Sequence, residues 1–155
     1  MPQIKGLSIA AFDLRIAGLY KESMDAMLEI LTKLEESPLR DMGDSTLSTD
    51  IAAANMRLQQ LPDDCICNMQ ENQMKRSIAL NKLYADLAHI LYFVKPALFA
   101  DVSLRMVQLT LSKGITPTAP IGFACYGQTL ASMGNISKGC RLGEFVVGLH
   151  LVDFM

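Results

Sequence analysis

The sequence lacks an excess of charge of either sign. Lysine and arginine together number 14, and aspartate and glutamate 16, which gives a formal net charge of −2. Such a chain has no broad basic field with which to hold nucleic acid or an anionic membrane surface by counterion release. We therefore expect neither nucleic acid nor a membrane among its partners, and expect a protein or a small molecule instead.

The sequence also lacks an uninterrupted hydrophobic run long enough to cross a bilayer. The best candidate, residues 87–109, is broken by Lys95, Pro96, Asp101 and Arg105. Each charge at mid-bilayer depth would cost about 2.5–3.5 kcal/mol, so no membrane span is expected. The first residues show no charged stretch followed by an apolar run and a small-residue cleavage site, which argues against a secretory signal. The predicted location is the cytoplasm.

Cysteine is present at only four positions, Cys65, Cys67, Cys125 and Cys140. In a cytoplasmic protein we expect these thiols to be reduced. Cys65 and Cys67 are separated by one residue, whereas zinc sites use a wider spacing and require further ligands. Cys125 lies in an apolar helical pattern with no histidine or acid near it in sequence, which is typical of an inert thiol. The cysteines therefore predict neither a metal site nor a nucleophile.

Catalytic signatures are missing as well. The string closest to a phosphate-binding loop, GNISKGC at residues 134–140, does not have the required Gly-Lys-Ser/Thr order. The HRD and DFG signatures of kinases, HExxH, GxSxG and the dinucleotide fingerprint are all absent. We therefore predict that this segment is not an enzyme and binds no cofactor.

What the sequence does contain is helical periodicity. Apolar residues recur with helical spacing on both sides of Gly18, which predicts a hairpin of two helices over residues 1–36. Residues 37–75 are rich in polar and turn-forming residues and predict a loop-rich connection with one short helix, at 51–61. Residues 76–155 carry further helical stripes and predict a helical-repeat region that is truncated at its C-terminal end.

The first and last helical hairpins can be overlaid with a constant offset of 116 residues, which places Gly18 on Gly134. Small residues then fall where the two helices of each hairpin would cross most closely: Ala11, Ser23, Gly127 and Gly139. We predict a structural role for these four residues, because a bulky side chain at a helix crossing keeps the two helices apart.

The stretch GLYKESMDAMLEIL, residues 18–31, resembles the turn and second helix of a tetratricopeptide-type repeat. In such repeats each hairpin buries its face against its neighbours. The resemblance implies an all-α fold of tetratricopeptide-like antiparallel hairpins, stacked as a short α-solenoid. The array must be irregular, because the 116-residue offset is not a multiple of the usual repeat of about 34 residues.

Four elements of the second half carry another resemblance: PALF at residues 96–99, SLRMVQLTL at 103–111, Gly114, and FACYG at 123–127. They resemble the helical-repeat region that follows the ATPase module in very large signalling proteins. Those proteins combine a serine/threonine kinase-like region, a STAND-class ATPase module, and GAF and histidine-kinase domains. The resemblance implies a helical arm, and none of the catalytic motifs of such a parent is present in this chain.

Two functions are compatible with these patterns. The first is a non-catalytic scaffold or protein-interaction segment, a fragment of a large ATPase and kinase signalling protein. This interpretation is favoured because the last apolar stripe is still running at the C-terminus, without the polar outer face of a terminal repeat. The alternative is a stand-alone tetratricopeptide-like adaptor that binds a peptide or a partner helix in its concave groove.

Overall fold

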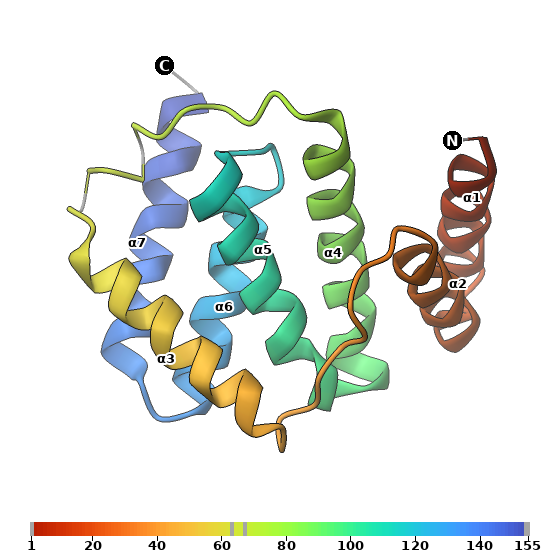
Figure 1. Ribbon diagram of the computed structural model, residues 1–155, viewed down its shortest axis with the longest axis horizontal. Coiled ribbons are helices and arrows are strands. Elements are labelled where there is room, and N and C mark those ends of the chain that lie inside the picture. The colour runs from red at the N-terminus through yellow and green to blue at the C-terminus, as the bar shows by residue number, and fades with distance from the viewer. Residues whose placement is uncertain (1, 63, 67, 154–155) are drawn as a thin grey trace.

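The computed structural model describes residues 2–62, 64–66 and 68–153, and this part of the chain is helical without any β-strand (Figure 1). The predicted all-α class is therefore confirmed. The elements are α1 (Pro2–Ile16), α2 (Tyr20–Lys33), α3 (Ser45–Gln60), α4 (Lys75–Val94), the 3₁₀ turn η1 (Pro96–Leu98), α5 (Phe99–Lys113), α6 (Ala119–Ser132) and α7 (Ile136–Asp153).

The first helix of the first hairpin and the first helix of the last one end in the same way. Gly18 and Gly134 both adopt positive φ, at 80° and 91°. Leu19 N donates to Leu14 O at 2.9 Å, and the equivalent bond runs from Asn135 N to Leu130 O at 2.8 Å. This six-to-one bond, together with a left-handed glycine, satisfies carbonyls that the helix end would otherwise leave unpaired. The 116-residue offset thus relates two turns of the same geometry.

Helix α3 is longer than the sequence pattern indicates, because it begins at Ser45 and not at Ile51. Asp44 is its N-cap, and its side chain accepts hydrogen bonds from Thr46 N at 2.8 Å and from Thr46 Oγ1 at 2.6 Å. The Asp, Ser and Thr residues that favoured a loop in the sequence are instead the capping residues and first turns of the helix. The predicted boundary between the loop and the short helix was therefore wrong by about two helical turns.

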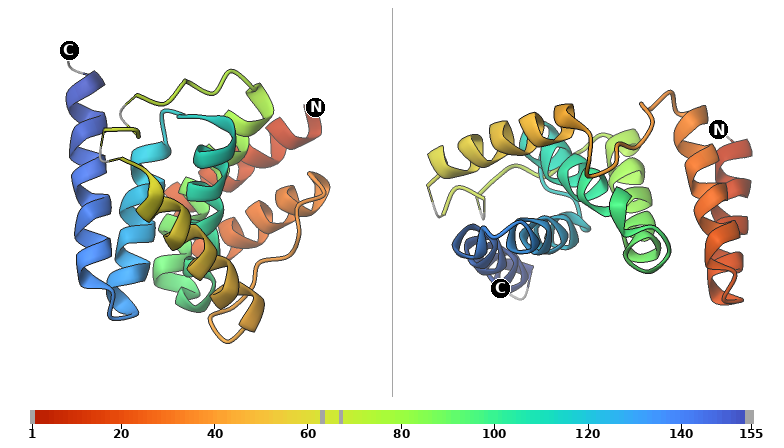
Figure 2. Two further views of the ribbon diagram at one scale, coloured as in Figure 1. Left: turned by 60° about the vertical axis from the view of Figure 1, so that its left-hand side comes forward. Right: turned by 90° about the horizontal axis from the view of Figure 1, so that it is seen from below.

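Six of the helices follow one another as a row of antiparallel neighbours, with α1 and α2 at one end and α6 and α7 at the other (Figures 1 and 2). Helix α3 departs from this order, since it lies across α5 and packs beside α6 and α7 (Figure 1). One face of α3 is buried there, through Leu47, Ile51, Ala54 and Leu58.

Two hydrophobic cores fill the spaces between these helices. The first joins α1 and α2 to α4, and the second joins α3 to α6 and α7. Helix α5 belongs to both, because Val102 and Met106 pack into the first core while Leu104 and Val107 pack into the second. All four side chains are fully buried or nearly so. A helix buried on opposite sides ties the two halves of the fold together.

The linker between α2 and α3 is fastened to α5 by charge. The fully buried carboxylate of Asp101 accepts from Arg40 N at 2.8 Å, from Arg40 Nη2 at 3.0 Å and from Arg105 Nη2 at 2.9 Å. Arg105 also donates to the carbonyls of Ser37 and Pro38, at 2.7 and 2.8 Å. A buried carboxylate is stable when it is paired and hydrogen-bonded in this way. The backbone of residues 37–40 is consequently fixed against α5.

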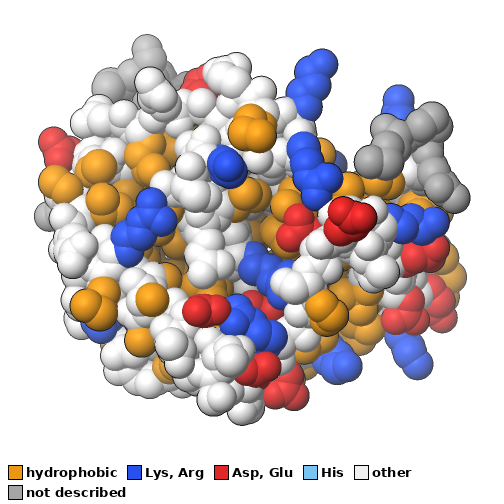
Figure 3. Space-filling model, in the orientation of Figure 1, with side chains coloured by type: hydrophobic (Ala, Val, Ile, Leu, Met, Phe, Trp, Pro, Cys, Tyr) orange, Lys and Arg blue, Asp and Glu red, His pale blue; other side chains and the backbone are white. Residues whose placement is uncertain are grey.

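Figure 3 shows charged side chains of both signs toward the α1–α2 end and near the start of α3, while hydrophobic side chains are more frequent toward α7. Within the described residues, no helix combines the length and the hydrophobicity needed to cross a bilayer.

Candidate functional site

The four predicted helix-crossing residues lie in two facing pairs. In the first hairpin, the hydroxyl of Ser23 donates to the backbone carbonyl of Ala11 at 2.6 Å, and both residues are buried. A serine side chain is short enough to let α2 approach the backbone of α1, and its hydroxyl gains a partner there. The contact joins the two helices.

In the last hairpin the facing pair is Gly127 and Gly139. A Cβ atom added at Gly139 would lie 2.7 Å from the carbonyl oxygen of Gly127, and one added at Gly127 would lie 3.1 Å from that of Gly139. The first distance is shorter than a carbon atom and an oxygen atom can tolerate without movement of the backbone. Glycine at both positions therefore allows the backbones of α6 and α7 to touch.

The cysteines form no site in the described residues. Cys65, Cys125 and Cys140 are free thiols, and Cys67 lies outside the described residues. Burial raises the pKa of the Cys125 thiol, which disfavours the thiolate that a nucleophile requires. In the part of the chain that the structure describes, no group of three or more His, Cys, Asp or Glu side chains is placed to hold a metal ion.

An open groove lies between α1 and α4. Helix α2 packs directly against α4, but among the described residues the backbones of α1 and α4 do not approach one another closely. Two adjoining cavities of about 350 and 420 Å³ occupy the gap and share the side chains of Lys5, Ser8, Ala79 and Leu83. We call this space the α1–α4 groove.

The floor of the α1–α4 groove is apolar, and small side chains line part of its sides. The floor consists of side chains from α1, α2 and α4 that belong to the first core, among them Ala11, Met27 and Ile30. Ser8 of α1 and Ala79 of α4 line both cavities, and side chains this small leave the space open. Ile9 and Phe12 of α1 line it too, although they are 55% and 49% exposed. Apolar surface of this kind is characteristic of a binding groove.

The rim of the groove is mainly cationic. Among the described lining residues, four are cationic, namely Lys5, Arg15, Arg76 and Lys82, and Asp86 alone is acidic. Arg15 reaches across the groove to Asp86, with Nη1 and Oδ1 3.2 Å apart, and Lys82 lies 3.9 Å from the same carboxylate. One carboxylate thus faces two cations. The chain as a whole is slightly acidic, so the positive charge of this rim is local.

No protein-family model, curated protein or solved structure matches this chain. Its function must therefore be inferred from its own geometry.

The sequence pattern did not predict the α1–α4 groove. The predicted hairpin stacking would have packed the first helix against the rest of the array. Its expected apolar stripe was Leu7, Ala10, Ala11 and Leu14, but Ala10 is exposed, and Ile9 and Phe12 lie outside this stripe. The sequence nevertheless indicated an uncovered apolar surface on α1. This helix carries apolar residues on more than one face, and a single neighbouring helix such as α2 cannot cover them all.

Proposed function

We propose that this chain is a non-catalytic, irregular tetratricopeptide-like segment that binds another protein, and that its α1–α4 groove receives an acidic amphipathic helix of the partner. The observation that carries this proposal is the open groove with an apolar floor and a cationic rim. Peptide recognition by an apolar groove between helices is a common use of helical folds.

The dimensions of the groove fit a short helix. The lining residues of α1 run from Ile4 to Arg15, which corresponds to roughly 17 Å along a helix axis. A partner helix of about three turns would match this length. Its apolar face would cover Ile9 and Phe12, which water now contacts, and burial of apolar area contributes about 25 cal/mol per Å² before the costs of association.

The cationic rim of the groove favours a partner helix whose polar face is acidic. Lys5 has no ion pair or hydrogen bond among the described residues, and Lys82 is 3.9 Å from a carboxylate that Arg15 already binds. Both ammonium groups are solvent-exposed, so glutamate or aspartate side chains of a partner could pair with them. Complementary charge raises the association rate and excludes basic partners more than it raises affinity.

The larger context stays a prediction. An arm within an ATPase and kinase signalling protein is consistent with an interaction segment, and so is a stand-alone adaptor. For either one we expect calorimetry with Mg-ATP to detect no saturable binding, because the chain has no glycine-rich loop to present backbone N–H groups to phosphates.

Fluorescence anisotropy with a labelled amphipathic peptide of about 12 residues, carrying leucine on one face and glutamate on the other, tests the groove directly. Saturable binding is expected, and replacing each glutamate of the peptide by glutamine should weaken it. Ala79→Trp should fill the groove and reduce affinity at least tenfold, whereas Ala10→Trp, on an exposed position of α1 outside the groove, should not.

A second matched pair tests the charge. Lys82→Glu should weaken binding of the acidic peptide, and Lys21→Glu, the same change at an exposed position away from the groove, should leave it unchanged. The proposal fails if the peptide does not bind, or if both tryptophan variants bind it equally well.

A further inference from the structure

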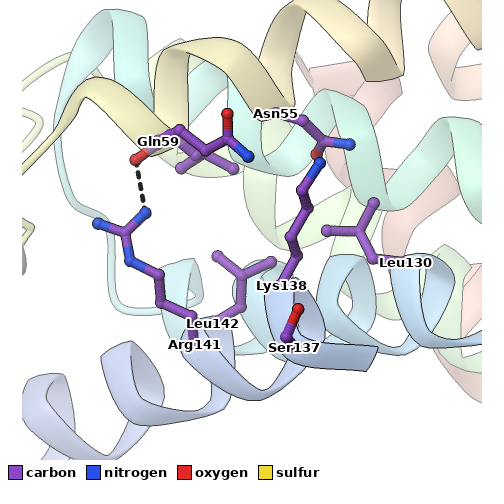
Figure 4. Close-up of a pocket in the computed structure, with 8 residues that line it drawn as sticks. Asn55, Gln59, Leu130, Ser137, Lys138, Arg141 and Leu142 are labelled. Atoms are coloured by element: carbon purple, nitrogen blue, oxygen red, sulfur yellow. Dashed lines mark hydrogen bonds between the residues drawn. The ribbon is translucent and has the colours of Figure 1, made fainter. Parts of the chain in front are cut away.

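A separate pocket lies at the opposite end of the molecule, between α3 and the beginning of α7 (Figure 4). Its volume is about 260 Å³, close to the lower limit of about 300 Å³ for small-molecule sites. Three buried leucines, Leu58, Leu130 and Leu142, form its apolar surface. None of these residues contributes to the α1–α4 groove, so the pocket is independent of the function proposed above.

The polar side of the pocket offers hydrogen-bond donors but no carboxylate. Ser137, Lys138 and Gln59 line it together with Asn55 and Arg141, and none of the described lining residues is acidic. Arg141 is committed to α3, because its guanidinium donates to the carbonyls of Leu58 and Leu61 at 2.9 and 2.8 Å. It forms a wall of the pocket and holds α3 against α7.

Lys138 is the cation that faces the pocket. It extends from α7 toward Asn55 of α3 (Figure 4), and it is only partly exposed. Within the described residues its ammonium group has neither an ion-pair partner nor a hydrogen-bond partner. An ammonium group that is partly removed from water and unpaired gains from an anion placed beside it.

Asn55 supplies a second donor and is 9% exposed. The Tyr126 hydroxyl donates to its Oδ1 at 2.7 Å, which fixes the orientation of the amide. The amide NH₂ group then has no acceptor among the described residues. The NH₂ group is not among the buried atoms that lack a partner, so it keeps contact with solvent and is free to donate to a ligand beside Lys138.

We propose that this pocket binds a small aliphatic monocarboxylate, whose carboxylate accepts hydrogen bonds from Lys138 and Asn55 and whose hydrocarbon part lies on the three leucines. A monocarboxylate fits better than inorganic phosphate, because the lining is mainly apolar and, of its two cations, Arg141 already donates to the carbonyls of Leu58 and Leu61. The same chemistry is found in a free short-chain acid and at the C-terminus of a peptide that ends in an aliphatic residue.

Titration of the full chain with hexanoate, followed by amide and side-chain NMR shifts, tests the site. Saturable shifts are expected at Asn55, Leu130 and Leu142, and 1-hexanol should bind at least tenfold more weakly. Lys138→Met should reduce hexanoate affinity at least tenfold, Lys138→Arg should retain most of it, and Lys95→Met, at an exposed lysine far from the pocket in sequence and fold, should not change it.

N-acetyl-leucine and its amide distinguish the two sources of the carboxylate. Tighter binding of N-acetyl-leucine than of hexanoate would indicate a peptide C-terminus, and the reverse would indicate a free acid. In both cases the amide should bind weakly. The proposal is overturned if hexanoate produces no saturable shifts, if hexanol binds equally well, or if Lys138→Met, with an unchanged circular dichroism spectrum, retains full affinity.

Discussion

The first hairpin, α1 and α2, and the last hairpin, α6 and α7, share the same turn but differ in how their helices meet. In the last hairpin two glycines bring the backbones into contact, whereas in the first a buried serine hydroxyl bridges the helices. The last hairpin is covered by α3 and α5, while α1 is left with one open side. The comparison teaches that one hairpin pattern can give a fully covered pair of helices at one end and a pair with an open apolar groove at the other.

The largest effect is expected where the first hairpin is attached to the rest. Asp101→Ala would leave Arg40 and Arg105 without their buried partner, and breaking such a pair costs about 3–5 kcal/mol. We expect the lower end, about 3 kcal/mol, because both arginines retain some contact with solvent. Urea unfolding measures the loss.

Hydrogen exchange locates the effect of this substitution. The amide of Arg40, which donates to Asp101, should exchange faster in Asp101→Ala, together with the neighbouring amides of the linker. Asp13→Ala, at an exposed acid of α1, is the control and should leave both stability and exchange at Arg40 unchanged. Unchanged exchange at Arg40 in Asp101→Ala would show that the linker is held by other contacts.

Gly139→Leu should destabilise the last hairpin where the backbones of α6 and α7 approach most closely. The new side chain would meet the backbone of α6, and overpacking of this kind costs about 1–3 kcal/mol. Thermal unfolding of the variant measures the loss. Gly127→Leu should behave in the same way. If both variants unfold like the parent chain, the close contact between α6 and α7 does not exist in solution.

Ser23→Ala should have a smaller effect, in the first hairpin. It removes one buried hydrogen bond to the carbonyl of Ala11, with an expected loss of about 0.5–1.5 kcal/mol in the free energy of unfolding. Ser48→Ala, at an exposed helical serine of α3, is the matched control and should lie within measurement error. Equal effects in urea unfolding would contradict the role given to Ser23.

The smallest effect distinguishes two glycines of the same helix. No atom lies within 4 Å of a Cβ added at Gly143, so Gly143→Ala should stabilise α7 by about 0.5–1 kcal/mol through its higher helix propensity. Gly139→Ala should have the opposite sign, because its Cβ would meet the carbonyl of Gly127. If both substitutions change the free energy of unfolding in the same direction, helix propensity, and not the close approach of α6 and α7, determines their effect.

The helices could be predicted from the sequence because their signals are local. Apolar spacing located most of them, and Gly18 and Gly134 marked turns whose backbone requires a positive φ. The start of α3 was missed because capping residues and loop residues are the same amino acids, and only the hydrogen bonds of Asp44 distinguish the two.

The tertiary features could not be predicted in the same way. Asp101 and Arg105 indicated only that residues 87–109 do not span a membrane, and their role in fixing the linker depends on Arg40, which is 61 residues from Asp101 in sequence. The α1–α4 groove, which Ser8 of α1 and Ala79 of α4 both line, likewise depends on how far α1 lies from α4. No local pattern encodes such a distance, because it results from the packing of α2 and the path of the linker.

The position of α5 determines how mechanical load would travel through the molecule. A pull on the first hairpin reaches α5 through the backbone of residues 37–40, which Asp101 and Arg105 hold. Because the side chains of α5 are shared by both cores, the same tension would act on the packing of α3, α6 and α7. A displacement of the N-terminal helices would therefore strain the far end of the fold through α5, both by way of the linker and by way of α4, on which α2 packs.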